Sequence, residues 1–272
     1  AGMHIAIEGC AHGALEEIYA TLQDIERSNV FKIDMVIICG DFQTTRNADD
    51  MSAMAVPPKY RSMCSFYKYY SGELVAPYLT LFIGGNHEAS GFLCELPFGG
   101  WVAPNIYYLG FAGVVNFGGI RIGGISGIYK AKDYCKGHFE FPLFTEETKR
   151  SVYHIRNLEV FRLKQLSNQL DIFLSHDWPT VVTSMNDPDL SICADLQRLY
   201  RIKPDFETDV NSSSLGSRPA NDLLKCLRPC YWFAAHLHIK FPALIGHKVG
   251  GINVSFPHTA NMLQPVVCLN FF

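Results

Sequence analysis

Five short apolar runs in this chain each end in a segment rich in Asp, Asn, His or Cys. Short continuous apolar runs are typical of strands that are buried on both faces, as in parallel sheets. The segments that follow the runs are Gly9–Gly13, Gly40–Asp41, Gly84–Glu88, Ser175–Asp177 and His236–His238. Because ligand sites in open α/β sheets lie just beyond the carboxyl ends of the strands, we expect these segments to converge on one site.

Strand-like and helical patterns alternate along the chain, which predicts an α/β fold. The β-rich runs are His4–Ile7, Met35–Cys39, Leu79–Ile83, Ile106–Leu109, Ile120–Ile125, Asp171–Leu174 and Tyr231–Ala234. Helices are expected from Leu15 to about Asn29, over Pro58–Tyr70 and over Leu158–Gln169, with a polar loop or lid at Lys203–Pro219. The order favours a two-sheet β-sandwich flanked by helices. With Ala1 and Gly2 set aside, we expect a single domain over residues 3–272.

Composition narrows the class of protein. Apolar residues make up 48% of the chain and charged residues 18%, a globular balance that excludes wholesale disorder. The net charge of −3 argues against a broadly basic surface that coats nucleic acid. The nine cysteines form no repeating framework, which indicates a reducing compartment, and no apolar run reaches the ~20 residues of a membrane span. We therefore expect a soluble intracellular protein with no membrane partner.

The five segments together carry the donor types of a binuclear metal site. Imidazole, carboxylate, amide oxygen and thiolate can hold two first-row metals, and a shared Asp can bring them to the ~3.5–4 Å spacing that clamps a phosphoryl group. Each segment alone has an ordinary explanation: a His after a strand is more often structural, and Gly-Asp is usually a turn. Five such coincidences in one order favour a metal site.

These residues, in this order, resemble the calcineurin-like metallophosphoesterases, whose signature runs Asp-x-His, Gly-Asp, Gly-Asn-His-Glu, His and Gly-His-x-His. The resemblance spans positions 10–238 and departs from the signature at Cys10, in place of Asp, and at Ala235, in place of Gly. It implies a first metal held by Cys10, His12, Asp41 and His238, and a second held by Asp41, Asn86, His176 and His236. It also implies that Asp41 bridges the two metals and that His87 is a proton donor rather than a ligand.

Cys10 bears on the identity of the metals. Thiolate is a poor partner for Mg²⁺ and suits Zn²⁺ or Fe²⁺ better. We therefore expect two divalent ions, Fe²⁺ and/or Zn²⁺, with Mn²⁺ a competent substitute. Taken alone, Cys10 would be interpreted as a small buried residue at the end of a strand.

Further segments are similar to the branch of this superfamily that acts on intron lariat RNA. They are Gly9–Gly13, Tyr60-Arg61, Phe66–Glu73, Trp101–Gly110, Ser126–Tyr129, Ser151–Asn157 and Ser175–Pro179. This resemblance implies hydrolysis of the 2′–5′ phosphodiester at the branch point during mRNA processing, in the nucleus, with the cytoplasm as a second location. His87 would then protonate the leaving 2′ oxygen and contribute ~10²–10⁴-fold to the rate. The alternatives are a general phosphomonoesterase or phosphoprotein phosphatase, and a scaffold that has lost the chemistry.

Residues 129–157 are expected to be an insertion that recognises the lariat. Cations that contact phosphates and aromatic faces that stack on bases are what single-stranded RNA recognition needs. The segment contains Lys130, Lys132, Lys136, Lys149, Arg150, Arg156, Tyr129, Tyr134, Phe139, Phe141, Phe144 and Tyr153. The candidate substrate-binding residues are Tyr129, Arg156 and Asn157. An ordinary amphipathic surface loop is an equally good interpretation of any one of them.

A zinc-binding module is a further alternative, with Cys226, Cys230, His236 and His238 as its ligands. The two histidines are only two residues apart beside a predicted strand, and Pro229 interrupts the cysteines. Zinc fingers place their histidines three to five residues apart on a helix, so this interpretation carries little weight.

Overall fold

The computed structural model describes residues 2–184, 187–249, 252–254 and 267–269. The strands are β1 Ile5–Glu8, β2 Met35–Ile38, β3 Thr80–Phe82, β4 Gly100–Ala103, β5 Ile106–Tyr108, β6 Ala112–Phe117, β7 Ile120–Ile125, β8 Ile172–Ser175, β9 Leu190–Ala194, β10 Tyr231–Ala234, β11 Ala243–Val249, β12 Ile252–Val254 and β13 Val267–Leu269. The α-helices are α1 Leu15–Ser28, α2 Ala48–Ser52, α3 Phe66–Tyr70, α4 Ser90–Leu93, α5 Ala131–Tyr134, α6 Thr148–Ser151, α7 Asn157–Lys164, α8 Val181–Ser184, α9 Leu196–Ile202, α10 Phe206–Asn211 and α11 Arg218–Leu227.

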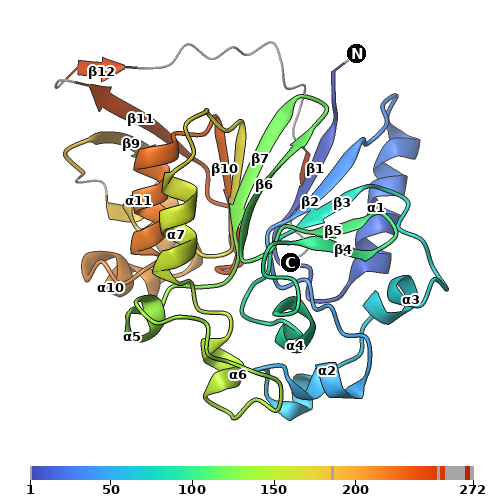
Figure 1. The fold of residues 1–272 in the computed structure, drawn as a ribbon. Coiled ribbons are helices and arrows are strands. Elements are labelled where there is room, and N and C mark those ends of the chain that lie inside the picture. The colour runs from blue at the N-terminus through green and yellow to red at the C-terminus, as the bar shows by residue number, and fades with distance from the viewer. Residues whose placement is uncertain (1, 185–186, 250–251, 255–266, 270–272) are drawn as a thin grey trace.

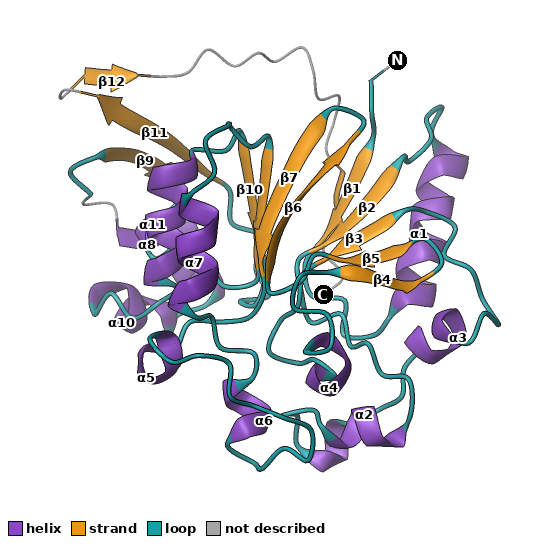
Figure 2. Cartoon of the chain, viewed as in Figure 1, coloured by secondary structure: helices purple, strands orange, loops and turns teal. Residues whose placement is uncertain are grey.

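Two sheets form the centre of the molecule, with helices outside them (Figures 1 and 2). The six-stranded sheet has the order β13-β1-β2-β3-β5-β4, and all its neighbours pair in parallel except β4, which is antiparallel to β5. The four-stranded sheet has the order β10-β8-β7-β6, with β10, β8 and β7 parallel. A three-stranded sheet, β12-β11-β9, is antiparallel. The predicted α/β sandwich is confirmed.

The layers follow from the alternation of side chains along the strands. On one face of the six-stranded sheet, Ile7, Ile37 and Leu81 pack against Ile122 and Leu174 of the four-stranded sheet. The apolar runs are therefore buried between the sheets and also beneath helices, which is why they lack a polar face.

Helices cover the outer faces of both sheets. Leu15, Ile18 and Leu22 of α1 are buried against the six-stranded sheet, in a cluster that includes Val36 and Phe82. On the opposite side of the molecule, α7 and α11 cover the four-stranded sheet. The buried residues of that layer are Val160, Leu163, Leu223, Leu227 and Phe173. None of the described helices combines the length and the apolar character that crossing a membrane requires.

The seven predicted strands are observed, but the expected helix over Leu158–Gln169 ends earlier, at Lys164, and one further helix and one loop prediction are corrected. The expected helix over Pro58–Tyr70 is a 3₁₀ turn at Pro58–Tyr60 followed by α3, because the chain between them is extended at Arg61 and left-handed at Cys64. The expected loop over Lys203–Pro219 contains α10 and the start of α11. Ser217 begins α11 by accepting a hydrogen bond from the amide of Ala220, as N-cap residues do.

Candidate metal centre

The predicted segments lie together where strands from both sheets end. β1, β2 and β3 of the six-stranded sheet lead to Cys10, Asp41 and Asn86. β8 and β10 of the four-stranded sheet lead to His176 and His236. The packing of the two sheets therefore assembles the site, because neither sheet alone carries all of these side chains.

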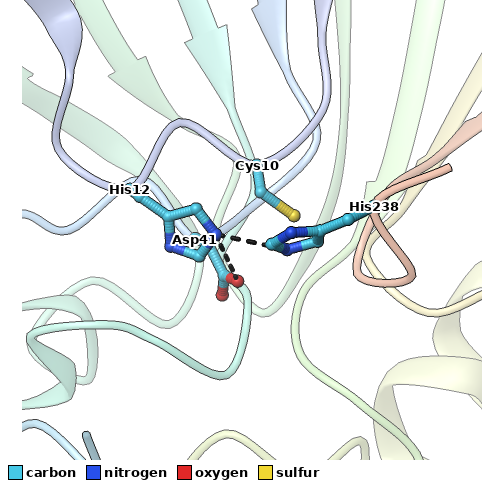
Figure 3. A group of neighbouring side chains, drawn as sticks. All are labelled: Cys10, His12, Asp41 and His238. Atoms are coloured by element: carbon cyan, nitrogen blue, oxygen red, sulfur yellow. Dashed lines mark hydrogen bonds and ion pairs between the residues drawn. The ribbon is translucent and has the colours of Figure 1, made fainter. Parts of the chain in front are cut away.

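One group of four side chains has the arrangement of a metal site. The ligand atoms of Cys10, His12, Asp41 and His238 all lie within 4.8 Å of one another, and the side chains point toward one another (Figure 3). His12 Nε2 lies 3.3 Å from His238 Nε2 and 3.8 Å from Asp41 Oδ2. Thiolate, imidazole and carboxylate ligands in a group of this size are typical of zinc or iron sites. This is the set that the resemblance implied for the first metal.

A second group shares Asp41 with the first. His176 Nε2 lies 3.3 Å from Asp41 Oδ1 and 3.1 Å from Asn86 Oδ1, and the ring centroid of His176 is 5.0 Å from that of His236. His176 Nδ1 donates a hydrogen bond to the carbonyl of Cys39 at 2.8 Å, since a carbonyl oxygen can only accept. In the neutral imidazole Nε2 is then an acceptor that faces two acceptor oxygens. A cation between them would satisfy all three atoms, so the donor set fits a second metal.

His87 has a different position from the other histidines. Its backbone amide donates a hydrogen bond to Asp41 Oδ1 at 2.8 Å, and its ring Nδ1 lies 3.7 Å from Asp41 Oδ2. Its side chain is 42% exposed, whereas that of His176 is fully buried. His87 is thus fixed at the backbone beside Asp41 and has its ring open to solvent.

Unusual backbone conformations aim these side chains. His12, Asp41, His236 and His238 have φ values of 45°, 48°, 63° and 50°, in the left-handed region. Such a conformation costs a non-glycine residue of order 1–3 kcal/mol and persists where the surroundings enforce it, commonly at functional sites. Four strained residues in one group therefore favour a functional origin.

Glycines beside these residues are required by close packing as well as by turns. A Cβ added to Gly85 would lie 2.2 Å from Asp41 Oδ1, and one added to Gly40 would lie 2.3 Å from His176 Nδ1. These glycines therefore make room for the ligand side chains.

Glu88 was not among the predicted site residues, but it is buried within the centre. Its carboxyl group accepts hydrogen bonds from the amides of Phe42 at 2.7 Å, Gln43 at 2.8 Å and Gly85 at 3.0 Å. It therefore joins the loop of Asp41 to the loop of Asn86 and His87. Burial, together with the charge of Asp41, raises the pKa of Glu88 to about 8. Its position directly after His87 was the signal that could have found it.

The electrostatics of the centre suit cation binding. Burial lowers the pKa of His12, His238 and His236, the last to about 4, so these imidazoles are neutral and able to ligate at pH 7. Burial would raise the pKa of Asp41, but its electrostatic interactions with the His176 and His87 side chains and the hydrogen bond from the His87 amide outweigh burial, and the pKa is lowered. Burial and Asp41 raise the pKa of the Cys10 thiol. A cation would reverse that shift and displace the proton, because the thiolate is the ligand.

The three candidate RNA-binding residues have different environments. Tyr129 is half-buried, and its amide donates to Asp177 Oδ2 at 3.1 Å. Asp177 directly follows His176 in the chain. Asn157 is exposed at the start of α7. Arg156 is 0% exposed, which places its guanidinium inside the protein and not on a surface that RNA could reach. We therefore no longer expect Arg156 to contact RNA, because its charge pairs with buried Glu140 instead.

The zinc-module interpretation does not fit the structure. Cys226 and Cys230 are exposed, and neither belongs to the metal-ligand group found among the described residues. His238 instead belongs to the group that contains Cys10, and His236 lies beside His176.

Comparisons with known proteins show the family of this chain. A model of the calcineurin-like phosphoesterase family matches residues 3–240. The chain belongs to the calcineurin-like phosphoesterase family. The chain is 62% identical over 246 residues to a Drosophila melanogaster protein named lariat debranching enzyme, covering 90% of this chain and 45% of the fly protein.

Two further relatives carry the same name. A Homo sapiens protein is 55% identical over 246 residues, covering 90% of this chain and 44% of its own length. An Arabidopsis thaliana protein is 53% identical over 254 residues, covering 93% of this chain and 59% of its own length. The phosphoesterase chain therefore spans about half the length of the curated relatives it matches.

Proposed function

We propose that this chain is the metal-dependent phosphodiesterase part of an enzyme that hydrolyses the 2′–5′ phosphodiester at the branch point of intron lariat RNA during mRNA processing. The observation that carries the proposal is the pair of donor groups that share Asp41, with Cys10 in the first of them, at the joined edges of the two sheets. The names of relatives that match nine-tenths of the chain support the choice of substrate.

Two divalent ions would be held by the donor groups described above. When bound, they supply the Lewis acidity that acidifies a water molecule and offsets charge on the phosphoryl oxygens. We expect Zn²⁺ or Fe²⁺ at the Cys10 group, because thiolate disfavours hard ions, with Mn²⁺ able to substitute. Elemental analysis of protein purified without chelators should find about two equivalents, with Zn or Fe among them. Magnesium alone would contradict this assignment.

His87 is proposed as the group that protonates the leaving 2′ oxygen. Because Nδ1 lies toward Asp41, Nε2 is the nitrogen that remains to face a bound substrate. A proton donor must reach the reacting atom, and the open position of the His87 ring meets that condition.

Residues around the centre could hold the RNA. The amide of Tyr129 donates to Asp177, which directly follows His176. The carbonyl of Tyr153 accepts from the amide of Ile128, next to Gly127, which is hydrogen-bonded to Gly84 of the centre. Both tyrosines therefore lie near the centre. Burial is the main cause of the lowered pKa of His238. The charge of Asp41 opposes this effect, and the positive charge of Lys203 adds to it. Aromatic faces and a cation near the metals suit unstacked bases and a flanking phosphate.

The decisive test compares three substrates in parallel. A synthetic branched RNA, a linear RNA of the same sequence and a phosphopeptide are incubated with the protein, and Zn²⁺, Fe²⁺ and Mn²⁺ are titrated separately. We expect cleavage of the branch alone, which leaves a linear product with a free 2′-hydroxyl. Hydrolysis of the phosphopeptide without cleavage of the branch would support the general phosphatase instead.

We also propose that the protein resides in the nucleus, because splicing generates the substrate in the nucleus. The cytoplasm is proposed as a second location. Imaging of the fluorescently labelled full-length protein should show a nuclear signal. Exclusion from the nucleus would contradict this proposal and leave the chemistry untouched.

A further inference from the structure

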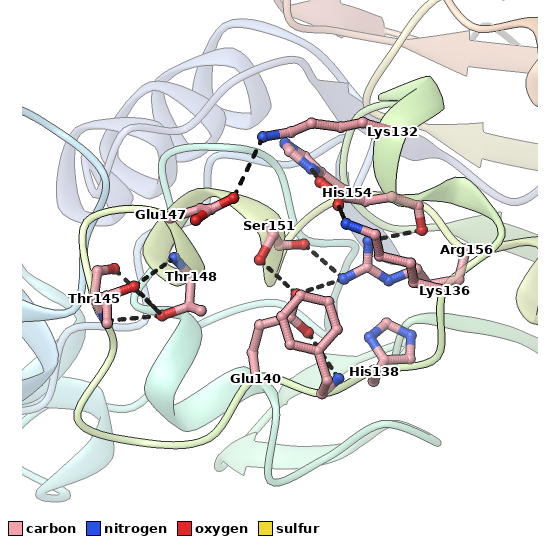
Figure 4. A network of polar contacts seen from close by, with 12 residues as sticks. Lys132, Lys136, His138, Glu140, Thr145, Glu147, Thr148, Ser151, His154 and Arg156 are labelled. Atoms are coloured by element: carbon pink, nitrogen blue, oxygen red, sulfur yellow. Dashed lines mark hydrogen bonds and ion pairs between the residues drawn. The ribbon is translucent and has the colours of Figure 1, made fainter.

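The segment 129–157 buries a network of charged and polar groups (Figure 4). Arg156 Nη2 donates to Glu140 Oε1 at 2.5 Å and to the carbonyl of Ser151 at 3.1 Å. Its Nη1 donates to the carbonyl of Asp133 at 3.1 Å. One buried guanidinium thus joins three separate parts of the segment: α5, the extended stretch around Glu140, and the end of α6.

The acidic partners in this interior are themselves held in place. Ser151 Oγ donates to Glu140 Oε1 at 2.5 Å. Burial would raise the pKa of Glu140, but the hydrogen bond from Ser151 and the charge of Arg156 outweigh it and lower the pKa, so Glu140 is ionised. Asp133 Oδ2 lies 2.7 Å from His154 Nδ1. Hydrogen bonds of this kind are directional, so the network fixes the shape of the segment more strictly than apolar packing would.

The base of the segment is attached to the metal centre. The amide of Ile128 donates to the carbonyl of Tyr153 at 3.1 Å, and the amide of Ile155 donates to the carbonyl of Ile128 at 2.9 Å. Gly127 donates to the carbonyl of Gly84 at 2.8 Å, two residues before Asn86. The two ends of the segment are therefore joined to each other and to a loop of the metal centre.

We propose that Arg156 and Glu140 are positioning residues that set the shape of segment 129–157 beside the metal centre and so determine how tightly the branched strand is bound. This inference rests on the proposed function. Both side chains are buried, so neither contacts RNA. The metal-ligand residues lie on loops that follow other strands and have hydrogen bonds of their own, such as those from His176 to Cys39 and from His87 to Asp41. Loss of the pair is therefore expected to affect binding of the RNA and to spare the chemistry.

The test measures steady-state kinetics of Glu140→Ala, which leaves the guanidinium buried without its carboxylate. We expect KM for the branched RNA to rise by about ten-fold or more with kcat within about two-fold, the signature of lost binding in the ground and transition states alike. Metal content and hydrolysis of bis(4-nitrophenyl) phosphate, a small diester that does not span the segment, should stay at the wild-type level.

Two further variants are compared with Glu140→Ala. Glu147→Ala breaks the exposed pair with Lys132 in the same segment and should change nothing, because such surface pairs contribute little. Arg156→Lys keeps the charge but cannot reach three acceptors at once, so its KM should lie between those of wild type and Glu140→Ala. It also serves as the test if Glu140→Ala does not fold.

The outcomes separate the inference from the function on which it rests. A parallel fall in activity toward the branched RNA and the small diester would mean that the pair merely holds the fold, and an unchanged KM would mean that it has no part in binding. Either result overturns the inference. Wild-type protein that hydrolyses the small diester but not the branch would overturn the proposed function itself.

Discussion

The metal centre and the segment 129–157 lie side by side but are stabilised in different ways. In the metal centre, strands from two sheets deliver the side chains, and glycines and left-handed residues then aim them. In the segment, two short helices surround a buried ionic network around Arg156, Glu140 and Asp133.

This difference indicates which region tolerates change. The loops of the metal centre follow strands that are packed in a large apolar core. The apolar contacts of these strands therefore hold the loops in place when a single hydrogen bond is altered. The segment depends on a few directional contacts between buried charges, and removal of one partner from such a pair is strongly destabilising. We therefore expect substitutions in the segment to change the local structure of the segment and the binding of RNA. Substitutions in the centre should change the rate of the reaction.

The largest effect is expected at His87, which tests whether the centre can lose its chemistry without losing its structure. His87→Ala should lower kcat by ~10²–10⁴-fold, the usual contribution of a positioned proton donor. Metal content, measured by elemental analysis, should stay at the wild-type level. Loss of one metal equivalent would instead make His87 a ligand.

Substitution at Gly85 tests how closely the centre is packed. A methyl group at this position would collide with Asp41 Oδ1, and overpacking of this kind typically costs about 1–3 kcal/mol. Gly85→Ala should therefore lower the free energy of unfolding, measured with denaturant, and also the metal content. The matched control is Gly91→Ala in α4, where the added atom would lie 3.7 Å from its nearest neighbour. Equal behaviour of the two variants would contradict this account of the centre.

We expect the segment 129–157 to open at low pH, when Asp133 becomes protonated. Burial would raise the pKa of this carboxyl, but hydrogen bonds from Lys136 and His154 outweigh it and lower the pKa from 3.8 to about 2. A carboxyl whose pKa is lowered in the folded state stabilises that state above its unfolded pKa, and the stabilisation is lost as the pH falls through the folded value. Hydrogen exchange in peptides from 129–157, corrected for its intrinsic pH dependence, should therefore increase between pH 4 and pH 2. In Asp133→Asn this increase should be smaller, with the remainder due to Glu140.

The smallest effect is expected at Ser151. Ser151→Ala removes one hydrogen bond to Glu140 and leaves the ion pair with Arg156, which should cost about 1 kcal/mol of the free energy of unfolding. The control is Ser212→Ala, since Ser212 is exposed and bonds only within its own turn region. A loss for Ser151→Ala no larger than for the control would show that the network does not rest on this hydroxyl.

Much of the centre could be predicted from the order of motifs, because parallel strands place their carboxyl ends at a common edge. The apolar runs before Cys10, Asp41 and His176 marked those edges without any knowledge of their spatial order. Strands such as β4 and β9 were not predicted. β4 lies at the edge of the six-stranded sheet and β9 in the separate antiparallel sheet, and both are only partly buried, so they lack the continuous apolar pattern on which the prediction depended.

Arg156 shows where sequence reasoning fails. A buried arginine and a surface arginine have the same identity in the sequence, and only the contacts with Glu140, Ser151 and Asp133 distinguish them. Basic and aromatic residues in 129–157 were therefore interpreted together as a binding surface, although part of the charge belongs to the interior.

The sequence by itself determined the α/β class and the family, and it predicted the residues of the candidate metal centre, because each motif directly follows an apolar run and keeps its place in the chain order. Only the tertiary structure decided how the two sheets bring those motifs together, that Glu88 joins two of the loops, and that Arg156 is buried. The physical reason is that pairing between distant groups depends on distance and orientation in space. Neither is encoded in the local pattern of any one segment.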